Sequence, residues 1–373
     1  MTGESRRGLL RPALAELQPY EPGKPVEEVQ RELGLERVVK LASNEGPFGP
    51  FPAALDALAA GAPELNRYPD GGAYRLRLAL AERHDVAPGA IALGAGADGV
   101  LDTLTQATLD PGDELVCGWP SFPSYVIYAR RQGATPVLVP LRDLRYDLDA
   151  VADAVTPRTK LVCIAHPNNP TGTSNGRAEV LRYLERVPEH VLTVLDQAYF
   201  EYVTDPDYVD GVEELAKQGR RVLVLRTFSK IFGLAGLRIG YGVGPADVVA
   251  AICQVRRPFD LSTPAQSMAL ASLGDEAEVA RRRRLNAEGR GAVEDALRDA
   301  GFAVAAPAVA NFVYAAVGDD ARPLFEALLR LGVIVRPLQG FGSPGAIRVS
   351  VGTPDETAVF AAALAEVATA ATP

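Results

Sequence analysis

The chain has 373 residues, 47% of them hydrophobic, which is enough for one large domain and a smaller one. Its net charge of -9 and pI near 5.1 argue against a nucleic-acid-binding surface. No apolar run reaches the roughly 18 residues of a membrane span. Three distant cysteines in apolar runs predict buried free thiols in a reducing compartment, so we expect a cytoplasmic protein.

Seven apolar runs rich in β-branched residues alternate with helical segments in the first two thirds of the chain. Several runs are continuously apolar, which is typical of strands buried on both faces of a sheet. We therefore predict an α/β fold whose large domain is a three-layer αβα arrangement with a mainly parallel seven-stranded sheet. The predicted strands are Ala90–Gly94, Glu114–Cys117, Thr135–Pro140, Lys160–Ala165, Val191–Leu195, Arg221–Arg226 and Ile239–Val243.

After Pro258 the pattern changes to a long polar segment, Asp275–Ala300, which predicts a helix. The run Arg281–Arg284 inside it is interpreted as a solvated helix face. Short strands and one further helix follow, so we expect a smaller α+β domain at the C-terminus. These elements are the strands Phe302–Ala306, Asn311–Val317, Gly332–Arg336 and Ala346–Gly352 and the helix Arg322–Leu331.

These patterns divide the chain into three parts. Residues 1–41 show no sheet pattern and are expected to pack on the small domain or on a partner subunit. Residues 42–260 are predicted to form the large domain, and residues 261–373 the small one.

Lys230 is the first candidate functional residue, because only five of the 38 lysine and arginine side chains are lysines. An amine can lose its proton and attack a carbonyl, whereas a guanidinium cannot. Lys230 is therefore either a Schiff-base nucleophile or a lysine that ends a buried strand and reaches to water. The neighbouring Thr227, Ser229 and Arg238 favour the first interpretation, because hydroxyls and a guanidinium together form a phosphate-binding cup.

Three further motifs follow predicted strands. The glycine turn Gly94–Gly99 opens a helix and presents N–H groups to a phosphate, although it lacks the acidic residue of a nicotinamide fingerprint. Asn169 lies in a proline-rich turn and can donate to a flat ligand. Asp196 ends a buried strand, so it is either structural or the partner of a cation such as a protonated ring nitrogen. Tyr199 could reach a phenolate oxygen of the same ring.

Together these motifs resemble the pyridoxal-phosphate enzymes of fold type I, the class I/II aminotransferases. The resemblance covers nearly the whole chain and sharpens to the histidinol-phosphate aminotransferase family. It is carried by Gly94–Gly99, Asn169-Pro-Thr-Gly, Asp196-x-x-Tyr199 and Thr227-x-Ser-Lys230 with Arg238, and supported by the segments at 17–24, 40–45, 68–71 and 120–125 and by Arg348.

The resemblance implies pyridoxal 5'-phosphate as cofactor and a homodimer with shared active sites. It implies transamination of histidinol phosphate with 2-oxoglutarate, which gives imidazole-acetol phosphate and glutamate in histidine biosynthesis. An aromatic amino-acid aminotransferase and a phosphothreonine decarboxylase share these motifs and stay open as alternatives, and a nicotinamide oxidoreductase is a more distant one.

The resemblance also implies a role for each site residue. Lys230 would bond to the cofactor and then transfer the proton, and Asp196 would pair with the ring nitrogen. Two departures, Gly46 where the family commonly has Asn and Gln197 where it has Glu, put the substrate identity in doubt. The other implied contacts are Asn169 and Tyr199 at the ring oxygen, Phe122 on the ring face, Ala97, Asp98, Thr227, Ser229, Arg238 and Tyr68 of the partner subunit at the cofactor phosphate, Arg348 and Asn44 at the substrate, and Tyr20 and Arg336 at the substrate phosphate.

Overall fold

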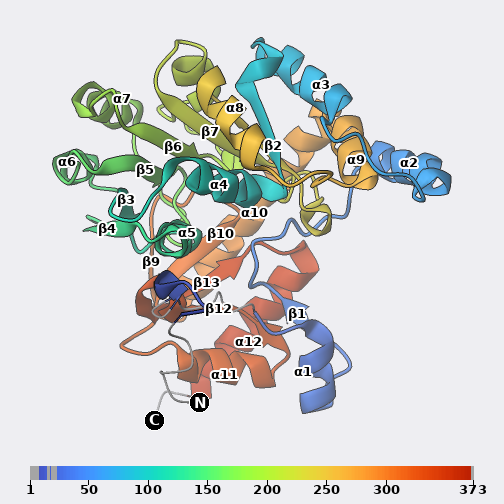
Figure 1. Cartoon of the computed structure of the whole chain (residues 1–373). Coiled ribbons are helices and arrows are strands. Elements are labelled where there is room, and N and C mark those ends of the chain that lie inside the picture. The colour runs from blue at the N-terminus through green and yellow to red at the C-terminus, as the bar shows by residue number, and fades with distance from the viewer. Residues whose placement is uncertain (1–7, 15–16, 18–22, 371–373) are drawn as a thin grey trace.

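The computed structural model describes residues 8–14, 17 and 23–370 of the chain. A larger sheet with its helices forms the upper part of Figure 1, and a smaller sheet forms the lower part. Helix α1 (Val26–Leu33) and strand β1 (Val39–Lys40) belong to the lower part. The chain then builds the upper part and returns to the lower one through the long helix α10 (Glu276–Asp299).

The larger sheet contains all seven predicted strands, and the mainly parallel α/β fold is confirmed. Its strand order is β2-β8-β7-β6-β5-β3-β4, and β8 runs antiparallel to both of its neighbours. The other neighbouring pairs are parallel. The strands are β2 (Ile91–Gly94), β3 (Glu114–Trp119), β4 (Thr135–Pro140), β5 (Thr159–Ala165), β6 (Leu192–Asp196), β7 (Val222–Thr227) and β8 (Gly240–Val243).

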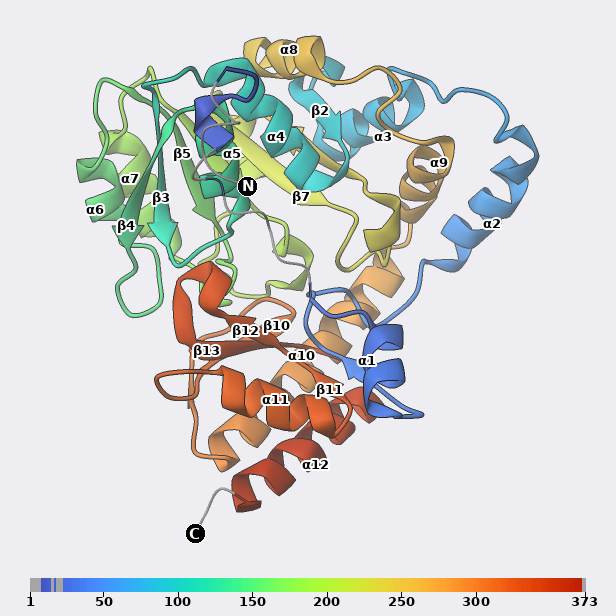
Figure 2. The same cartoon turned by 60° about the horizontal axis from the view of Figure 1, so that its bottom comes forward.

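Helices flank this sheet, as Figures 1 and 2 show. Every residue of β6 and β7 is buried beneath them, which explains why these strands are mainly apolar. Burial of one Val or Leu side chain stabilises the fold by about 1.5–3 kcal/mol. The helices are α2 (Pro52–Gly61), α3 (Tyr74–His84), α4 (Gly96–Thr108), α5 (Ser124–Gln132), α6 (Leu148–Asp153), α7 (Arg177–Arg186), α8 (Ala246–Val255) and α9 (Thr263–Ser272).

The smaller sheet is antiparallel with the order β12-β13-β10-β9. Strand β11 lies outside it and pairs in parallel with β1. The predicted strand Gly332–Arg336 is therefore split between two sheets, and its prediction as one strand was wrong. The elements are β9 (Ala303–Val304), β10 (Phe312–Ala316), β11 (Val333–Ile334), β12 (Arg336–Leu338), β13 (Ser343–Ser350), α11 (Arg322–Arg330) and α12 (Pro354–Ala370).

The smaller sheet has a hydrophobic cluster of its own, which includes Val313, Ile347 and Phe360. On the adjacent side, Val29 of α1 packs with Ile334 in a further small cluster. Helix α1 thus packs on the lower part of the molecule, whereas the short turn Pro12–Leu14 contacts helix α5 of the upper part. The division of the chain at residues 41 and 260 stays a prediction.

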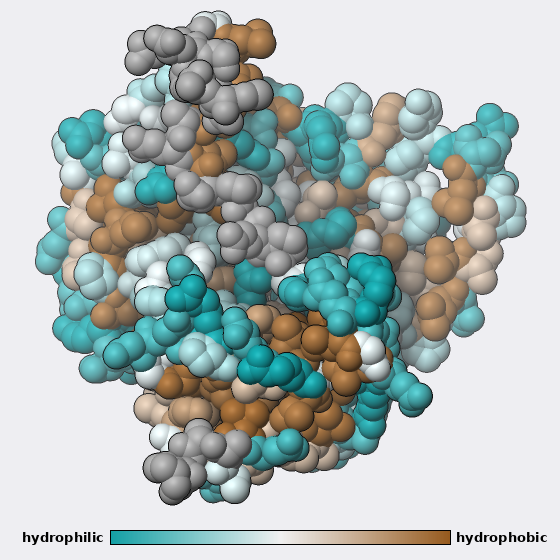
Figure 3. Space-filling model, turned by 90° about the horizontal axis from the view of Figure 1, so that it is seen from below, coloured by the Kyte–Doolittle hydropathy of each residue, from teal (hydrophilic) through white to brown (hydrophobic). Residues whose placement is uncertain are grey.

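Seen from below, hydrophobic residues gather in a patch bordered by hydrophilic ones (Figure 3), at the end where α11 and the alanine-rich α12 lie. Among the described residues no helix combines the length and the hydropathy that crossing a membrane requires. Cys117 and Cys163 are buried free thiols, as predicted, whereas Cys253 is partly exposed.

The arginine run on α10 differs from its predicted role as a solvated face. Arg281 and Arg284 are exposed and pair with glutamates on the same helix. Arg282 is only 5% exposed, and Arg283 donates from Nε to the carbonyl oxygen of Glu201. The interpretation was wrong for these two residues, because α10 crosses between the two sheets and presents one side to the larger one.

Candidate active site

A pocket of about 290 Å³ lies at the carboxyl edge of the parallel strands β5, β6 and β7. Ligands bind at this edge in open α/β sheets. Arg348 of β13 and Phe341 reach the pocket from the smaller sheet, so both parts of the molecule line it. The predicted site residues in its wall are Asn44, Ala97, Asp98, Phe122, Asn169, Asp196, Tyr199, Thr227, Ser229, Lys230, Arg238 and Arg348.

Lys230 follows the end of β7 and lines the pocket with its amine 5.4 Å from the centre of the Tyr199 ring. Burial lowers the pKa of this amine to about 8, and the charge of Arg348 adds to the effect. A desolvated ammonium loses its proton more easily because burial penalises the charged form. Near neutral pH the neutral, nucleophilic amine is therefore a minor fraction of Lys230, but a far larger one than for a lysine with the ordinary pKa of 10.5.

Asp196, the last residue of β6, is buried and accepts two hydrogen bonds. The hydroxyl of Tyr125 donates to Oδ2 at 2.8 Å, and the backbone N–H of Ala198 donates to Oδ1 at 3.1 Å. Burial raises the pKa of Asp196, and these two hydrogen bonds oppose that rise. A buried carboxylate of this kind is stabilised by a cation in the pocket.

Three polar side chains form a cup beside Lys230. Thr227 Oγ1 donates to Ser229 Oγ at 3.0 Å, and Arg238 Nη1 lies 3.5 Å from the same Ser229 oxygen. The N-terminal residues of α4, Gly96 and Ala97, form another wall of this cup. A side chain at position 96 would place Cβ 2.9 Å from Arg238 Nη2, so glycine keeps the cup open. A guanidinium, hydroxyls and a helix N-terminus together favour a phosphate.

The opposite wall carries Arg348, which is buried on β13. Its Nη1 donates to Asn169 Oδ1, and its Nη2 donates to the carbonyl oxygen of Ala42 at 2.8 Å. Asn44 Nδ2 donates to the Tyr199 hydroxyl at 3.0 Å. These contacts hold a guanidinium and an amide–phenol pair on the side of the pocket that the smaller sheet closes.

Two predicted residues, Tyr68 and Arg336, are not part of this wall. Tyr68 is 82% exposed and stacks on Phe259, with the ring centres 4.7 Å apart. Arg336 lies with its guanidinium carbon 5.7 Å from the centre of the Phe341 ring, and Phe341 lines the pocket. Tyr20 lies outside the described residues.

Tyr125 is a site residue that no role was predicted for. It lies on α5, fully buried, 71 positions before the aspartate that it contacts. The segment at 120–125 carries the family resemblance, but nothing in its spacing relates it to Asp196. Tyr128, one turn further on, likewise donates to Asp98 Oδ2 at 2.5 Å.

The two departures from the family pattern lie outside the pocket wall. Gln197 is fully buried and donates from Nε2 to the carbonyl oxygen of Val209 at 2.8 Å, while its Oε1 accepts from Arg226 at 2.9 Å. Gly46 packs against the backbone of Lys230, where a Cβ would lie 2.6 Å from the lysine carbonyl oxygen. Neither Gly46 nor Gln197 therefore faces a ligand in this pocket.

Comparison with known proteins agrees with this geometry. The model of the family "Aminotransferase class I and II" matches residues 36–364. A histidinol-phosphate aminotransferase of Moorella thermoacetica is 43% identical, with 96% of this chain and 92% of the relative covered. An aromatic amino acid aminotransferase of Thermobifida fusca is 44% identical, with 96% of each chain covered.

Among solved structures, the histidinol-phosphate aminotransferase of Sinorhizobium meliloti in complex with pyridoxal-5'-phosphate superposes with a TM-score of 0.87. It is 30% identical, and the match covers 97% of this chain and 98% of that one. The family model, the relatives and the solved structure all indicate the same family, and each match covers most of this chain. The chain belongs to the class I and II aminotransferases and is an aminotransferase.

Proposed function

We propose that the chain binds pyridoxal 5'-phosphate in the 290 Å³ pocket. The fit rests on the residues present: the cup of Thr227, Ser229 and Arg238 suits the phosphate, and the buried acceptor Asp196 suits a protonated ring nitrogen. Lys230 supplies an amine whose pKa is lowered to about 8 for the bond to the cofactor. The convergence of these groups on one pocket is the observation that carries the proposal.

Bound pyridoxal phosphate supplies an electron sink that makes the α-proton of an amino substrate acidic. The protein's own groups then act around it. Asp196 would hold positive charge on the ring nitrogen, and Tyr125, which donates to that carboxylate, would orient it. Arg348 binds the substrate carboxylate through its planar fork. Once the amino group of the substrate has displaced the Lys230 amine, Nζ would take the α-proton and return it on the cofactor side, and water would then release the keto product to complete half of the amino transfer.

We assign histidinol phosphate as the amino donor and 2-oxoglutarate as the acceptor. The assignment is supported by relatives named histidinol-phosphate aminotransferase at 42–44% identity. Arg336, with Tyr20, would receive the phosphate of the substrate, and Asn44 would lie beside it. The aromatic side chains Phe122 and Phe341 in the pocket wall suit the flat imidazole ring.

We further propose a homodimer in which Tyr68 of the partner subunit completes the phosphate cup. The exposed Tyr68 and its stacked neighbour Phe259 support this, since large aromatic side chains are enriched at interfaces. Mixing a Lys230→Ala chain with a Tyr68→Ala chain tests it. A shared site predicts that the mixture regains activity that neither variant has alone, whereas two independent sites give no recovery.

An aromatic amino-acid aminotransferase is the second candidate, because the Thermobifida fusca relative named so is 44% identical. Steady-state kcat/KM for histidinol phosphate, phenylalanine and tyrosine, each with 2-oxoglutarate, separates the two. We expect histidinol phosphate to be preferred by tenfold or more, equal to about 1.4 kcal/mol. A preference of that size for the unphosphorylated aromatic substrates would overturn the assignment.

A further inference from the structure

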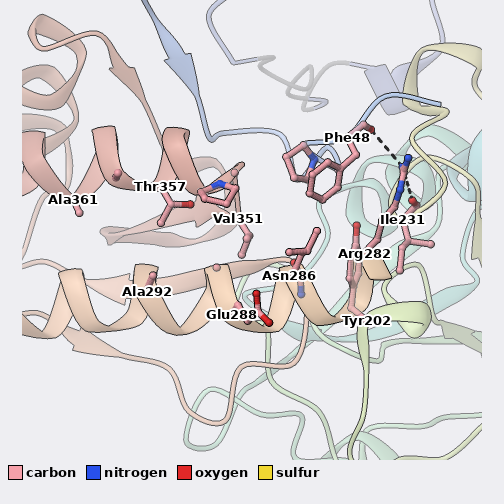
Figure 4. A pocket seen from close by; sticks show the side chains of 17 residues that line it. Phe48, Tyr202, Ile231, Arg282, Asn286, Glu288, Ala292, Val351, Thr357 and Ala361 are labelled. Atoms are coloured by element: carbon pink, nitrogen blue, oxygen red, sulfur yellow. Dashed lines mark hydrogen bonds between the residues drawn. The ribbon is translucent and has the colours of Figure 1, made fainter. Parts of the chain in front are cut away.

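A second cavity, of about 330 Å³, lies where helix α10, helix α12 and the loops of the larger sheet meet (Figure 4). It holds none of the charged pocket residues around Lys230, and its wall is mainly apolar. Its notable feature is Arg282, which extends from α10 toward Phe48 and Ile231. Ile231 directly follows Lys230 in the chain.

Arg282 donates to backbone carbonyls on two separate segments. Nη1 donates to the carbonyl oxygen of Ile231 at 3.0 Å, and Nη2 donates to that of Gly49 at 2.8 Å. Nε donates to Glu278 Oε1 at 2.7 Å, which fixes the guanidinium relative to its own helix. The side chain is only 6% exposed. Hydrogen bonds from a buried charged donor are about twice as strong as neutral ones.

The two segments that Arg282 joins also contact each other closely. Within the segment that begins at Lys230, the backbone N–H of Gly233 donates to the Lys230 carbonyl oxygen at 3.1 Å. A Cβ at Gly233 would lie 2.5 Å from the carbonyl oxygen of Gly49, and a Cβ at Gly46 would lie 2.6 Å from that of Lys230. The loop of Lys230 is thus held between the segment at 46–49 and the guanidinium of Arg282.

Helix α10 itself is anchored in the smaller sheet, because its Val293 and Leu297 belong to the hydrophobic cluster there. Arg282 therefore connects the smaller sheet, which carries Arg348, to the backbone of Lys230. Arg282 also lines the cavity, and its guanidinium lies over the Phe51 ring, with its central carbon 4.4 Å from the ring centre. A lysine at position 282 would carry a single point charge and would reach one of the two segments, whereas the forked guanidinium of arginine reaches both Ile231 and Gly49.

We propose that Arg282 is a positioning residue: through its bonds to Ile231 and Gly49 it sets the place of the Lys230 amine and couples it to helix α10. The inference rests on the proposed role of Lys230 in holding the cofactor. Displacement of a reacting group by about 1 Å lowers turnover by roughly a hundredfold. Arg282 acts through the backbone and makes no contact with the ligand pocket.

The test compares Arg282→Met and Arg282→Lys with the matched variants Arg284→Met and Arg284→Lys. Arg284 lies on the same helix, in the same run, and is exposed. For each holoenzyme, kcat, KM for the amino donor and the pH midpoint of the visible cofactor band are measured. We expect Arg282→Met to lower kcat by roughly ten- to a hundredfold, to shift the midpoint, and to leave KM nearly unchanged. The kcat and the pH midpoint of Arg282→Lys should lie between those of Arg282→Met and those of the parent protein.

The Arg284 variants should match the parent in all three readouts. If Arg282→Met does not fold, Arg282→Lys decides: a lowered kcat with a shifted midpoint supports the inference. Parent-like kcat and midpoint in the folded Arg282 variants would overturn it. A parent protein without any visible cofactor band would instead contradict the proposed function, so the two failures are distinguishable.

Discussion

Tyr125 donates its hydroxyl hydrogen to Oδ2 of Asp196 across 2.8 Å, and both side chains are buried. The pair joins helix α5 to the end of strand β6 beneath the ligand pocket. The hydrogen bond favours the ionised aspartate against the burial that raises its pKa. An aspartate kept ionised in this place can hold a proton on a ligand nitrogen, so we expect the tyrosine to contribute to catalysis without touching the substrate.

Tyr125→Phe should raise the pKa of Asp196 and lower kcat by roughly ten- to a hundredfold, since a hydrogen bond to a charged group contributes about 1.5–3 kcal/mol. The acidic limb of the pH–kcat profile should move to higher pH. Tyr183→Phe is the matched control, because Tyr183 is an equally buried tyrosine that bonds to Thr193, outside the pocket wall. Equal profiles for the two variants would refute the role of Tyr125.

Gln197→Glu should change stability and leave substrate choice intact. The amide Nε2 donates to the carbonyl oxygen of Val209, and a carboxylate oxygen in its place would face that acceptor without a hydrogen. We expect a loss of about 1–3 kcal/mol in the free energy of unfolding, measured by urea titration. The ratio of kcat/KM for histidinol phosphate and phenylalanine should stay constant. A changed ratio would show that this departure from the family governs specificity after all.

Lys230 should destabilise the cofactor-free protein. Its folded pKa, about 8, lies below its ordinary value of 10.5, so the folded protein holds an unfavourable ammonium at low pH. Below pH 8, Lys230→Met should therefore be more stable than the parent by about 3 kcal/mol. Between pH 8 and 10.5, Lys230 is protonated in the unfolded chain but largely neutral in the folded protein. The free energy of unfolding of the parent therefore rises with pH over this range, and the stability difference between the parent and Lys230→Met becomes smaller.

Urea unfolding of both cofactor-free proteins at pH 7 and pH 9.5 measures this difference. Leu225→Met, at a buried core position that keeps Lys230, controls for the general effect of introducing a methionine. A Lys230→Met variant less stable than its parent at pH 7 would contradict the lowered pKa.

Much of the fold and of the site could be predicted from local patterns. The strands that end at Ala165, Asp196 and Thr227 are mainly apolar with no alternation of polar residues, which indicates that they are buried and parallel. Because these strands are parallel neighbours, the polar residues that follow each strand lie at the same edge of the sheet. That is why Asn169, Asp196 and Lys230 could be grouped before the fold was known.

The rest depends on contacts that leave no periodic signal. Arg282 and Arg284 stand in one run of arginines, and only the crossing of α10 between the sheets buries the first and exposes the second. Strands β11 and β12 form one apolar run, yet they pair with different sheets. Tyr125 reaches Asp196 because helix α5 lies over the sheet, and no sequence spacing encodes that distance.

The proposed bond between Lys230 and pyridoxal phosphate can be tested by treating the purified holoenzyme with borohydride, digesting it and determining the mass of the peptide that carries Lys230. The account predicts that this peptide gains one phosphopyridoxyl group, that the visible band disappears on reduction, and that Lys230→Ala shows neither change and no turnover. An unmodified Lys230 peptide from an active enzyme, or turnover retained by Lys230→Ala, would contradict it.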